Sequence, residues 1–196
     1  MWRLSAVMLL AAFVGGCGEY GQSAPMGLAP GTAQWGGASP ATGPERLSRS
    51  ADALFVADAA HGSAAEIRLS RIALDRSDNA AIRDFAQQTI RQHERLNQEL
   101  ARVAADQGFG LPTRPPAATE RLAQALARES GPRFDHDYMA QMVNDHIRAL
   151  SLFDQASRTV RNPSIRALVE RTVPDLQAHL QRAQELNQTV SAAVRQ

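Results

Sequence analysis

Phe134 to Phe153 reads FDHDYMAQMVNDHIRALSLF, and this stretch decides the fold. Its apolar residues recur at spacings of three and four, which places them on one stripe of an amphipathic helix. A histidine, His146, stands in the middle of that stripe. The stripe consists of Met139, Met142, Val143, His146, Leu150 and Phe153. We therefore expect a core helix over residues 133–160 that carries a metal-ligand type of side chain into the core.

Three further long segments show the same helical periodicity, interrupted in the same way by one polar residue. The segments are residues 45–76 with Glu66, residues 79–107 with His93, and residues 163–194 with His179. In each segment the polar residue shares a face with small or apolar side chains. The pattern therefore predicts four long helices, each with one ligand-type residue on its apolar face.

Short turns separate these helices in pairs. The first turn, Asp75 to Asn79, has the chemistry of a helix cap, and Pro163 suits the first turn of the last helix. Residues 117–130 form a short amphipathic helix between the second and third long helices. We predict an all-α fold, an up-down-up-down four-helix bundle with this short extra crossover helix.

Composition excludes several classes of protein. The 196 residues carry a net charge of +1 and only 5% aromatic residues. Neither a basic patch with interleaved aromatics nor a Gly-rich phosphate loop is present, so we expect no nucleic-acid partner. The single cysteine, Cys17, excludes an intramolecular disulfide.

Residues 1–17 have the pattern of a lipoprotein signal peptide. Arg3 precedes an apolar run, Leu4 to Val14, that is short for a membrane span. The run ends in Val14-Gly15-Gly16-Cys17, which resembles the bacterial lipobox. Lipidation of Cys17 would anchor the protein stably to a membrane. The residue after Cys17 is not Asp, and in this the chain resembles lipoproteins that are sent to the outer membrane. We therefore expect the protein in the bacterial cell envelope, at the periplasmic face of the outer membrane.

Residues 18–44 are rich in Gly, Pro, Ala and Ser and cannot bury much apolar surface. We interpret them as a disordered tether. The predicted organisation is a signal peptide with its lipobox over 1–17, this tether, and a helical bundle domain over 45–196.

Glu66, His93, His146 and His179 are predicted to meet in the middle of the bundle. Each lies roughly 11–17 residues from its nearest turn, so at 1.5 Å per residue the partners differ in height by roughly 8 Å or less. A buried carboxylate and three buried imidazoles are costly unless a cation or a closed hydrogen-bond network satisfies them. These residue types suit zinc, iron, copper or manganese.

Two other residues are candidates for supporting roles at the same site. Asp175 precedes His179 by one turn, and Tyr138 precedes His146 by two turns. The alternatives are a helix-start carboxylate behind Pro174 for Asp175 and plain core packing for Tyr138. We interpret Gln92 and Asp145, which point about 100° away from the neighbouring histidines, as surface residues.

A di-iron centre is not expected. Such centres use Glu-x-x-His pairs, and the residues three positions before the histidines are Ile90, Val143 and Leu176. The sequence therefore predicts one transition-metal ion at most.

Several short motifs, in this order, resemble a known family, the domain of unknown function 4142 family. They are Ala64-Ala65-Glu66-Ile67, Gln92-His93, Phe134-Asp135 with Tyr138, Asp145-His146, and Pro174-Asp175-Leu176 with His179. The resemblance covers residues 50–188. It implies a ferritin-like fold in an exported bacterial protein, and it supports Glu66, His93, His146 and His179 as shared polar positions. The family usually has Asp where this chain has Gln92.

Three functions remain open from the sequence. The first is an envelope lipoprotein whose bundle binds one metal ion for handling, storage or stress response. The second is a structural or interaction module of the envelope without a metal. The third is a metal-dependent oxidoreductase; no nucleophilic catalytic arrangement is present, and the residues favour a protein that is not an enzyme. Its protein partners do not follow from the sequence.

Overall fold

The structure, a computed structural model, describes residues 44–112 and 114–194, with side chains from residue 51 onward. These residues form five helices and no strand: α1 (Pro44–Arg76), α2 (Ala80–Gln107), α3 (Ala117–Leu126), α4 (Gly131–Thr159) and α5 (Pro163–Val194). The predicted all-α fold is confirmed. Cys17, the predicted signal peptide and nearly all of the predicted tether lie outside the described residues. Within the described part of the chain, no helix combines the length and the apolar character that a membrane span requires.

Local sequence signals explain where the helices begin and end. Asn79 Oδ1 accepts a hydrogen bond from the backbone N–H of Ala81 at 3.0 Å and so caps α2. Gly108 ends α2 in the left-handed conformation, with φ of 69°, where a side chain would be strained. Asn162 Oδ1 caps α5 by accepting from the N–H of Ser164 at 2.9 Å.

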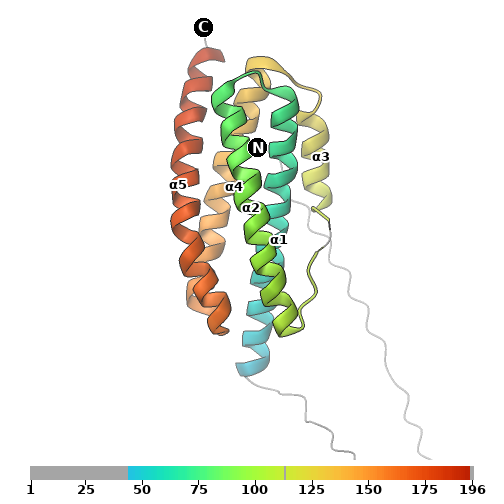
Figure 1. The fold of residues 1–196 in the computed structure, drawn as a ribbon, viewed down its shortest axis with the longest axis vertical. Helices are drawn as coiled ribbons and strands as arrows, with labels where there is room; N and C mark the ends of the chain where they lie inside the picture. Colours follow the sequence, from blue (N-terminus) through green and yellow to red (C-terminus); the bar gives the residue numbers. More distant parts are fainter. Residues whose placement is uncertain (1–43, 113, 195–196) are drawn as a thin grey trace, which may run out of the picture. The chain divides into compact units, whose positions relative to one another are not determined.

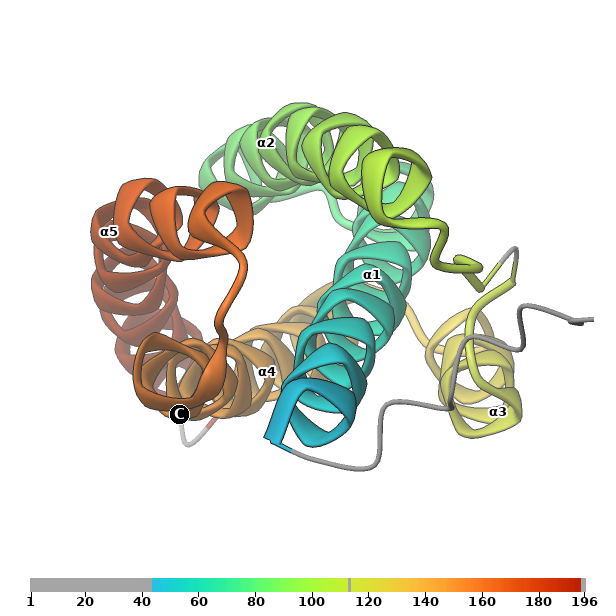
Figure 2. The ribbon, with the colours of Figure 1, turned by 90° about the horizontal axis from the view of Figure 1, so that it is seen from below.

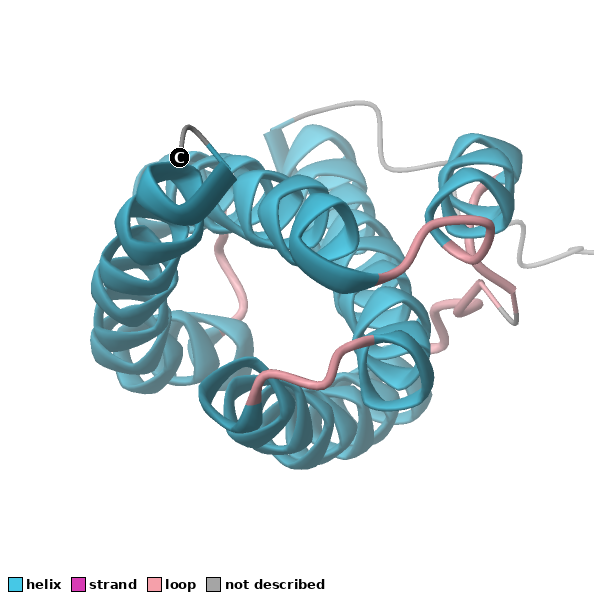
Figure 3. Ribbon diagram, turned by 90° about the horizontal axis from the view of Figure 1, so that it is seen from above, coloured by secondary structure: helices cyan, strands magenta, loops and turns pink. Residues whose placement is uncertain are grey.

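The four long helices pack side by side around a shared core, and α3 lies outside them against α1 (Figures 1 and 2). Figure 3 shows that the described chain is helical apart from the segments that join the helices. The hairpins α1–α2 and α4–α5 are each antiparallel, because a short turn joins two helices that pack along their length.

Two buried polar contacts establish the direction of α4. Ser77, in the α1–α2 turn, donates a hydrogen bond to Asp135 at the start of α4 at 2.6 Å. At the other end Asp52, near the start of α1, accepts from the N–H groups of Arg161 and Asn162 in the α4–α5 turn at 2.9 and 3.1 Å. α4 is therefore antiparallel to α1 and parallel to α2.

This direction corrects the predicted up-down-up-down order. The long helices run up, down, down and up, because the segment containing α3 returns the chain to the end where α2 began (Figure 1). The predicted crossover helix is present as α3, and the segment around it sets the direction of α4.

The core consists of two apolar clusters, one towards each end of the bundle. The cluster near the α1–α2 turn includes Leu69, Phe85, Phe134, Tyr138 and Met142. The cluster near the α4–α5 turn includes Phe55, Leu100, Phe153, Ile165 and Leu168. Polar residues of the bundle centre lie between these clusters, where apolar layers shield them from both ends.

Candidate metal centre

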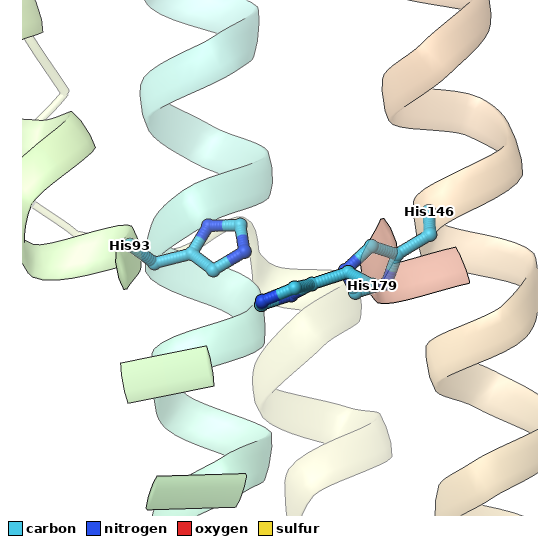
Figure 4. A group of neighbouring side chains, drawn as sticks. All are labelled: His93, His146 and His179. Carbon is cyan, nitrogen blue, oxygen red and sulfur yellow. The ribbon is translucent and has the colours of Figure 1, made fainter. Parts of the chain in front are cut away.

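Each of the four long helices contributes one buried ligand-type side chain to the centre of the bundle. Glu66 comes from α1, His93 from α2, His146 from α4 and His179 from α5. All four are buried, and His146 is fully inaccessible to solvent. The three histidines point toward one another from three different helices (Figure 4).

The four side chains are in direct contact. Glu66 Oε2 lies 3.1 Å from His93 Nε2 and 3.4 Å from His146 Nε2. His146 Nε2 lies 3.2 Å from His179 Nδ1. Three ring nitrogens, one from each histidine, lie within 4.8 Å of one another. The structure therefore brings together all four residues that the sequence placed at this height.

Helix geometry orients the imidazole of His146. Its Nδ1 lies 2.9 Å from the carbonyl oxygen of Met142, one turn earlier in α4. Because a carbonyl oxygen can only accept, Nδ1 carries the proton and donates. The other nitrogen, Nε2, then presents its lone pair to Glu66 and His179. Metal-binding histidines are commonly fixed in this way, with the second nitrogen held by a carbonyl.

The protein alone does not satisfy every polar atom of this cluster. Glu66 Oε2, His93 Nδ1 and His179 Nε2 are buried, and none has a hydrogen-bond partner among the described residues. The contacts of Glu66 Oε2 with the histidines are close, but they lack hydrogen-bond geometry. Unpartnered buried polar atoms are costly, and Glu66 Oε2 lies among the contacting ring nitrogens, where an ion would give it a partner.

Electrostatics of the cluster favour a charged Glu66 carboxylate and a neutral His179 imidazole. Burial acts to raise the pKa of Glu66, but the nearby His93, His146 and His179 outweigh it and hold the pKa below its ordinary value. Burial, followed by the neighbouring His146 and His93, lowers the pKa of His179 to about 4. Metal ligands must be deprotonated, and both shifts act in that direction.

The contact distances match the edges of a metal coordination shell. Metal–nitrogen and metal–oxygen bonds of about 2.0–2.2 Å in a tetrahedral site separate neighbouring ligand atoms by about 3.3–3.6 Å. The distance from His93 to Glu66 is 3.1 Å, that from Glu66 to His146 is 3.4 Å, and that from His146 to His179 is 3.2 Å. These three separations suit ligand atoms that share one ion. Within the described part of the chain, no second group of this kind is found.

Tyr138 and Asp175, the two candidate supporting residues, make no hydrogen bond to the cluster. The Tyr138 hydroxyl and Ser70 Oγ are 2.9 Å apart, so Tyr138 ties α4 to α1 one turn beyond Glu66. Asp175 is exposed and lines a small cavity that His93 and His179 also line.

Gln92 and Asp145 are not the surface residues that the sequence indicated. Both are half-buried, and Gln92 Oε1 is a buried acceptor with no partner among the described residues. Burial raises the pKa of the Asp145 carboxyl, which also accepts from Gln141 Nε2 at 2.8 Å. The interpretation failed because the buried face of each helix is wider than a single stripe. Their position directly before His93 and His146 was the available signal.

Two cavities reach the cluster from different sides. The smaller, about 80 Å³, lies between α2 and α5 and is mainly polar: Gln92, His93, Arg95, Glu99, Thr172, Asp175 and His179 line it with two leucines. The larger, about 250 Å³, lies mainly between α1 and α4 and reaches Glu66 and His93 through mostly apolar walls. Neither cavity follows from the periodicity of the sequence.

Fold and site together define a class of protein, an all-helical bundle with a buried glutamate–histidine cluster at its centre. The chain belongs to the family described as Domain of unknown function (DUF4142), whose match covers residues 36–186. Comparison with curated proteins found no match, and neither did comparison with solved structures.

Proposed function

We propose that the bundle binds one transition-metal ion through Glu66, His93, His146 and His179. The observation that carries this proposal is the chain of contacts of 3.1, 3.4 and 3.2 Å among their ligand atoms in a buried site. Zinc, iron, copper and manganese all accept this set of nitrogen and oxygen ligands. The single carboxylate and the lack of Glu-x-x-His pairs favour one ion over a di-iron centre.

A bound ion would remove the energetic cost of the cluster. Its charge would offset the buried carboxylate of Glu66, and it would supply a partner to Glu66 Oε2, which has no hydrogen-bond partner among the described residues. In the absence of an ion, His179 Nδ1 donates to His146 Nε2. An ion held by both nitrogens would displace that hydrogen bond, and the proton of His179 Nδ1 would move to Nε2 of the same ring.

The small cavity between α2 and α5 is the route that we propose for the ion. Its lining includes the exposed carboxylate of Asp175, whereas the other lining carboxylate, Glu99, pairs with Arg171 at 2.9 Å. Carboxylates at an entrance attract cations, and the lining histidines, His93 and His179, would receive the ion from this side. Asp175 would thus act in ion entry.

We place this site in a lipid-anchored protein of the bacterial envelope, held by Cys17 at the periplasmic face of the outer membrane. A ferritin-like assignment agrees with the order up, down, down and up and with the crossover before α4. Metal handling, storage or a response to metal stress would follow from one buried ion. No catalytic step is needed for any of these roles.

The alternative is a structural or interaction module in which the same cluster holds the helices in register. The hydrogen bonds of His146 to Met142 and His179 favour it, since both exist without an ion. A metal-dependent oxidoreductase is a third candidate, supported by the larger cavity that reaches Glu66.

Metal analysis of the untagged protein tests the proposal. After removal of bound metal with a chelator, titration with Zn²⁺ or Co²⁺ should saturate at one ion per chain. His93→Ala and His146→Ala should lose that ion. His61→Ala is the matched control, because His61 is a half-buried histidine of α1 outside the cluster. Binding that survives His146→Ala, or no binding at all, would favour the structural module.

A further inference from the structure

The larger cavity contains an unusual combination of surfaces. Its volume is about 250 Å³, and its walls are mainly apolar, formed by Ala59, Ala65, Leu96, Ala149, Leu152 and Phe153. Its polar surface comes from Ser63, Glu66 and His93 at the cluster and from Asp58, Asp145 and Arg148 towards solvent. A pocket with apolar walls and a few convergent polar groups is the usual form of a small-molecule site.

Glu66 is the acceptor that this cavity offers to a ligand. Ser63 Oγ already donates to the carbonyl oxygen of His93 at 3.1 Å. Glu66 Oε2 faces the histidines, which leaves Oε1 for a donor in the cavity. A carboxylate has room for both roles, since one oxygen can hold an ion while the other accepts a hydrogen bond.

Charge in and around the cavity disfavours anions. Glu66, Asp58 and Asp145 all contribute carboxylates. Arg148, the one cation that the described residues contribute to the lining, lies 3.4 Å from Asp145 and is partly neutralised by it. A negatively charged ligand would therefore meet repulsion at both ends of the cavity.

Gly62 provides an independent observation about this cavity. It lies inside α1, one turn before Glu66, where glycine destabilises a helix by roughly 0.5–1 kcal/mol relative to alanine. A Cβ added there would meet no atom within 4 Å, so packing does not require glycine. No positive φ requires it either. Gly62 is exposed and lines the cavity, so the absent side chain leaves the cavity wider at its rim.

We propose that this cavity binds a small neutral molecule with an apolar body of about two rings and a hydroxyl group that donates to Glu66. The size follows from comparison with an engineered apolar cavity of about 150 Å³, which holds benzene. This inference goes beyond the metal site and shares only Glu66 and His93 with it.

Binding of 2-naphthol to the full chain tests the inference. This probe has two rings and a hydroxyl group, and 2-naphthoate is its anionic counterpart of similar size. Calorimetry should show one 2-naphthol bound per chain, with 2-naphthoate at least about tenfold weaker. Equal binding of the two probes, or no binding of 2-naphthol, would overturn the inference.

Substitutions in the wall locate the bound probe. Gly62→Leu and Ala149→Leu should each weaken 2-naphthol binding at least about tenfold, because their side chains narrow the cavity. Ala178→Leu on the exposed face of α5 is the control and should bind like the unchanged protein. Retained helicity, measured by circular dichroism, shows that each variant is folded. Unchanged binding in both wall variants would contradict the proposed site.

Metal content of the same proteins separates this inference from the proposed function. Gly62→Leu and Ala149→Leu should keep one ion per chain, because neither residue is among the four ligands. If the protein binds 2-naphthol but no metal, the metal proposal fails and the cavity proposal stands. If it binds metal but no 2-naphthol, the reverse holds.

Discussion

The metal-free protein should lose stability between pH 7 and pH 5, and His179 should be a principal cause. Burial and the neighbouring His146 and His93 lower the pKa of His179 to about 4, from an ordinary value of 6.5. Below pH 6.5 the unfolded chain therefore takes up a proton that the folded protein does not. Each step down in pH favours the unfolded state until the pH nears 4.

The size of this effect follows from the two pKa values. His179 has a pKa of about 4 in the folded protein and 6.5 in the unfolded chain. This difference lowers the free energy of unfolding by about 1–2 kcal/mol between pH 7 and pH 5, after allowance for solvent screening near the polar cavity. Glu66 adds little in this window. Its pKa is lowered from 4.5, so its contribution is present above pH 4.5 and is lost only as the pH falls below that value.

Urea unfolding at pH 7, 6 and 5 in the presence of a chelator measures this loss. His179→Asn is the comparison, because the asparagine amide can replace the Nδ1 donor but does not titrate. Raised pKa values of Asp135 and Asp145 affect both proteins alike. The unchanged protein should lose about 1–2 kcal/mol more than the variant over this range. Equal losses in the two proteins would refute the reasoning.

Three further predictions concern stability. Gly62→Ala should raise the free energy of unfolding by about 0.5–1 kcal/mol, because its Cβ enters open space in a helix; lower stability would show that the glycine is required. Tyr138→Phe should cost about 1 kcal/mol by leaving Ser70 Oγ unpaired, without loss of bound metal in elemental analysis. Asp52→Ala should lower the free energy of unfolding in urea by about 2–4 kcal/mol, because the Asp52 carboxylate accepts hydrogen bonds from two backbone N–H groups. Asp58→Ala, an exposed change on the same helix, is the control and should alter the free energy of unfolding by no more than about 0.5 kcal/mol.

Helix positions could be predicted from the sequence because their signals are local. The apolar periodicity gave each long helix, and Asn79 and Gly108 mark the two ends of α2. Residues 45–76 form one helix despite Gly62, because tertiary packing on both sides of it outweighs its low helix propensity.

Helix direction could not be predicted in the same way. The direction of α4 depends on how the segment around α3 crosses the bundle, and contacts such as Ser77 with Asp135 join residues far apart in the sequence. The meeting of the four ligand-type residues was nevertheless expected correctly. His146 lies near the middle of α4, so reversal of that helix leaves its height almost unchanged.

The two cavities could not be predicted from the sequence. Periodicity predicts which way a side chain points but not how much space its neighbours leave. The signal was a group of small residues on α1 and α4, namely Ala59, Gly62, Ala65 and Ala149. In a chain rich in alanine, such a group is not distinctive.

The most direct test of the central claim is a crystal structure of the zinc-loaded protein with anomalous scattering recorded at the zinc edge. We expect one anomalous peak inside the bundle, about 2.0–2.2 Å from a carboxylate oxygen of Glu66 and from one ring nitrogen each of His93, His146 and His179. A peak confined to surface residues, or an empty cluster at saturating zinc, would contradict the metal site.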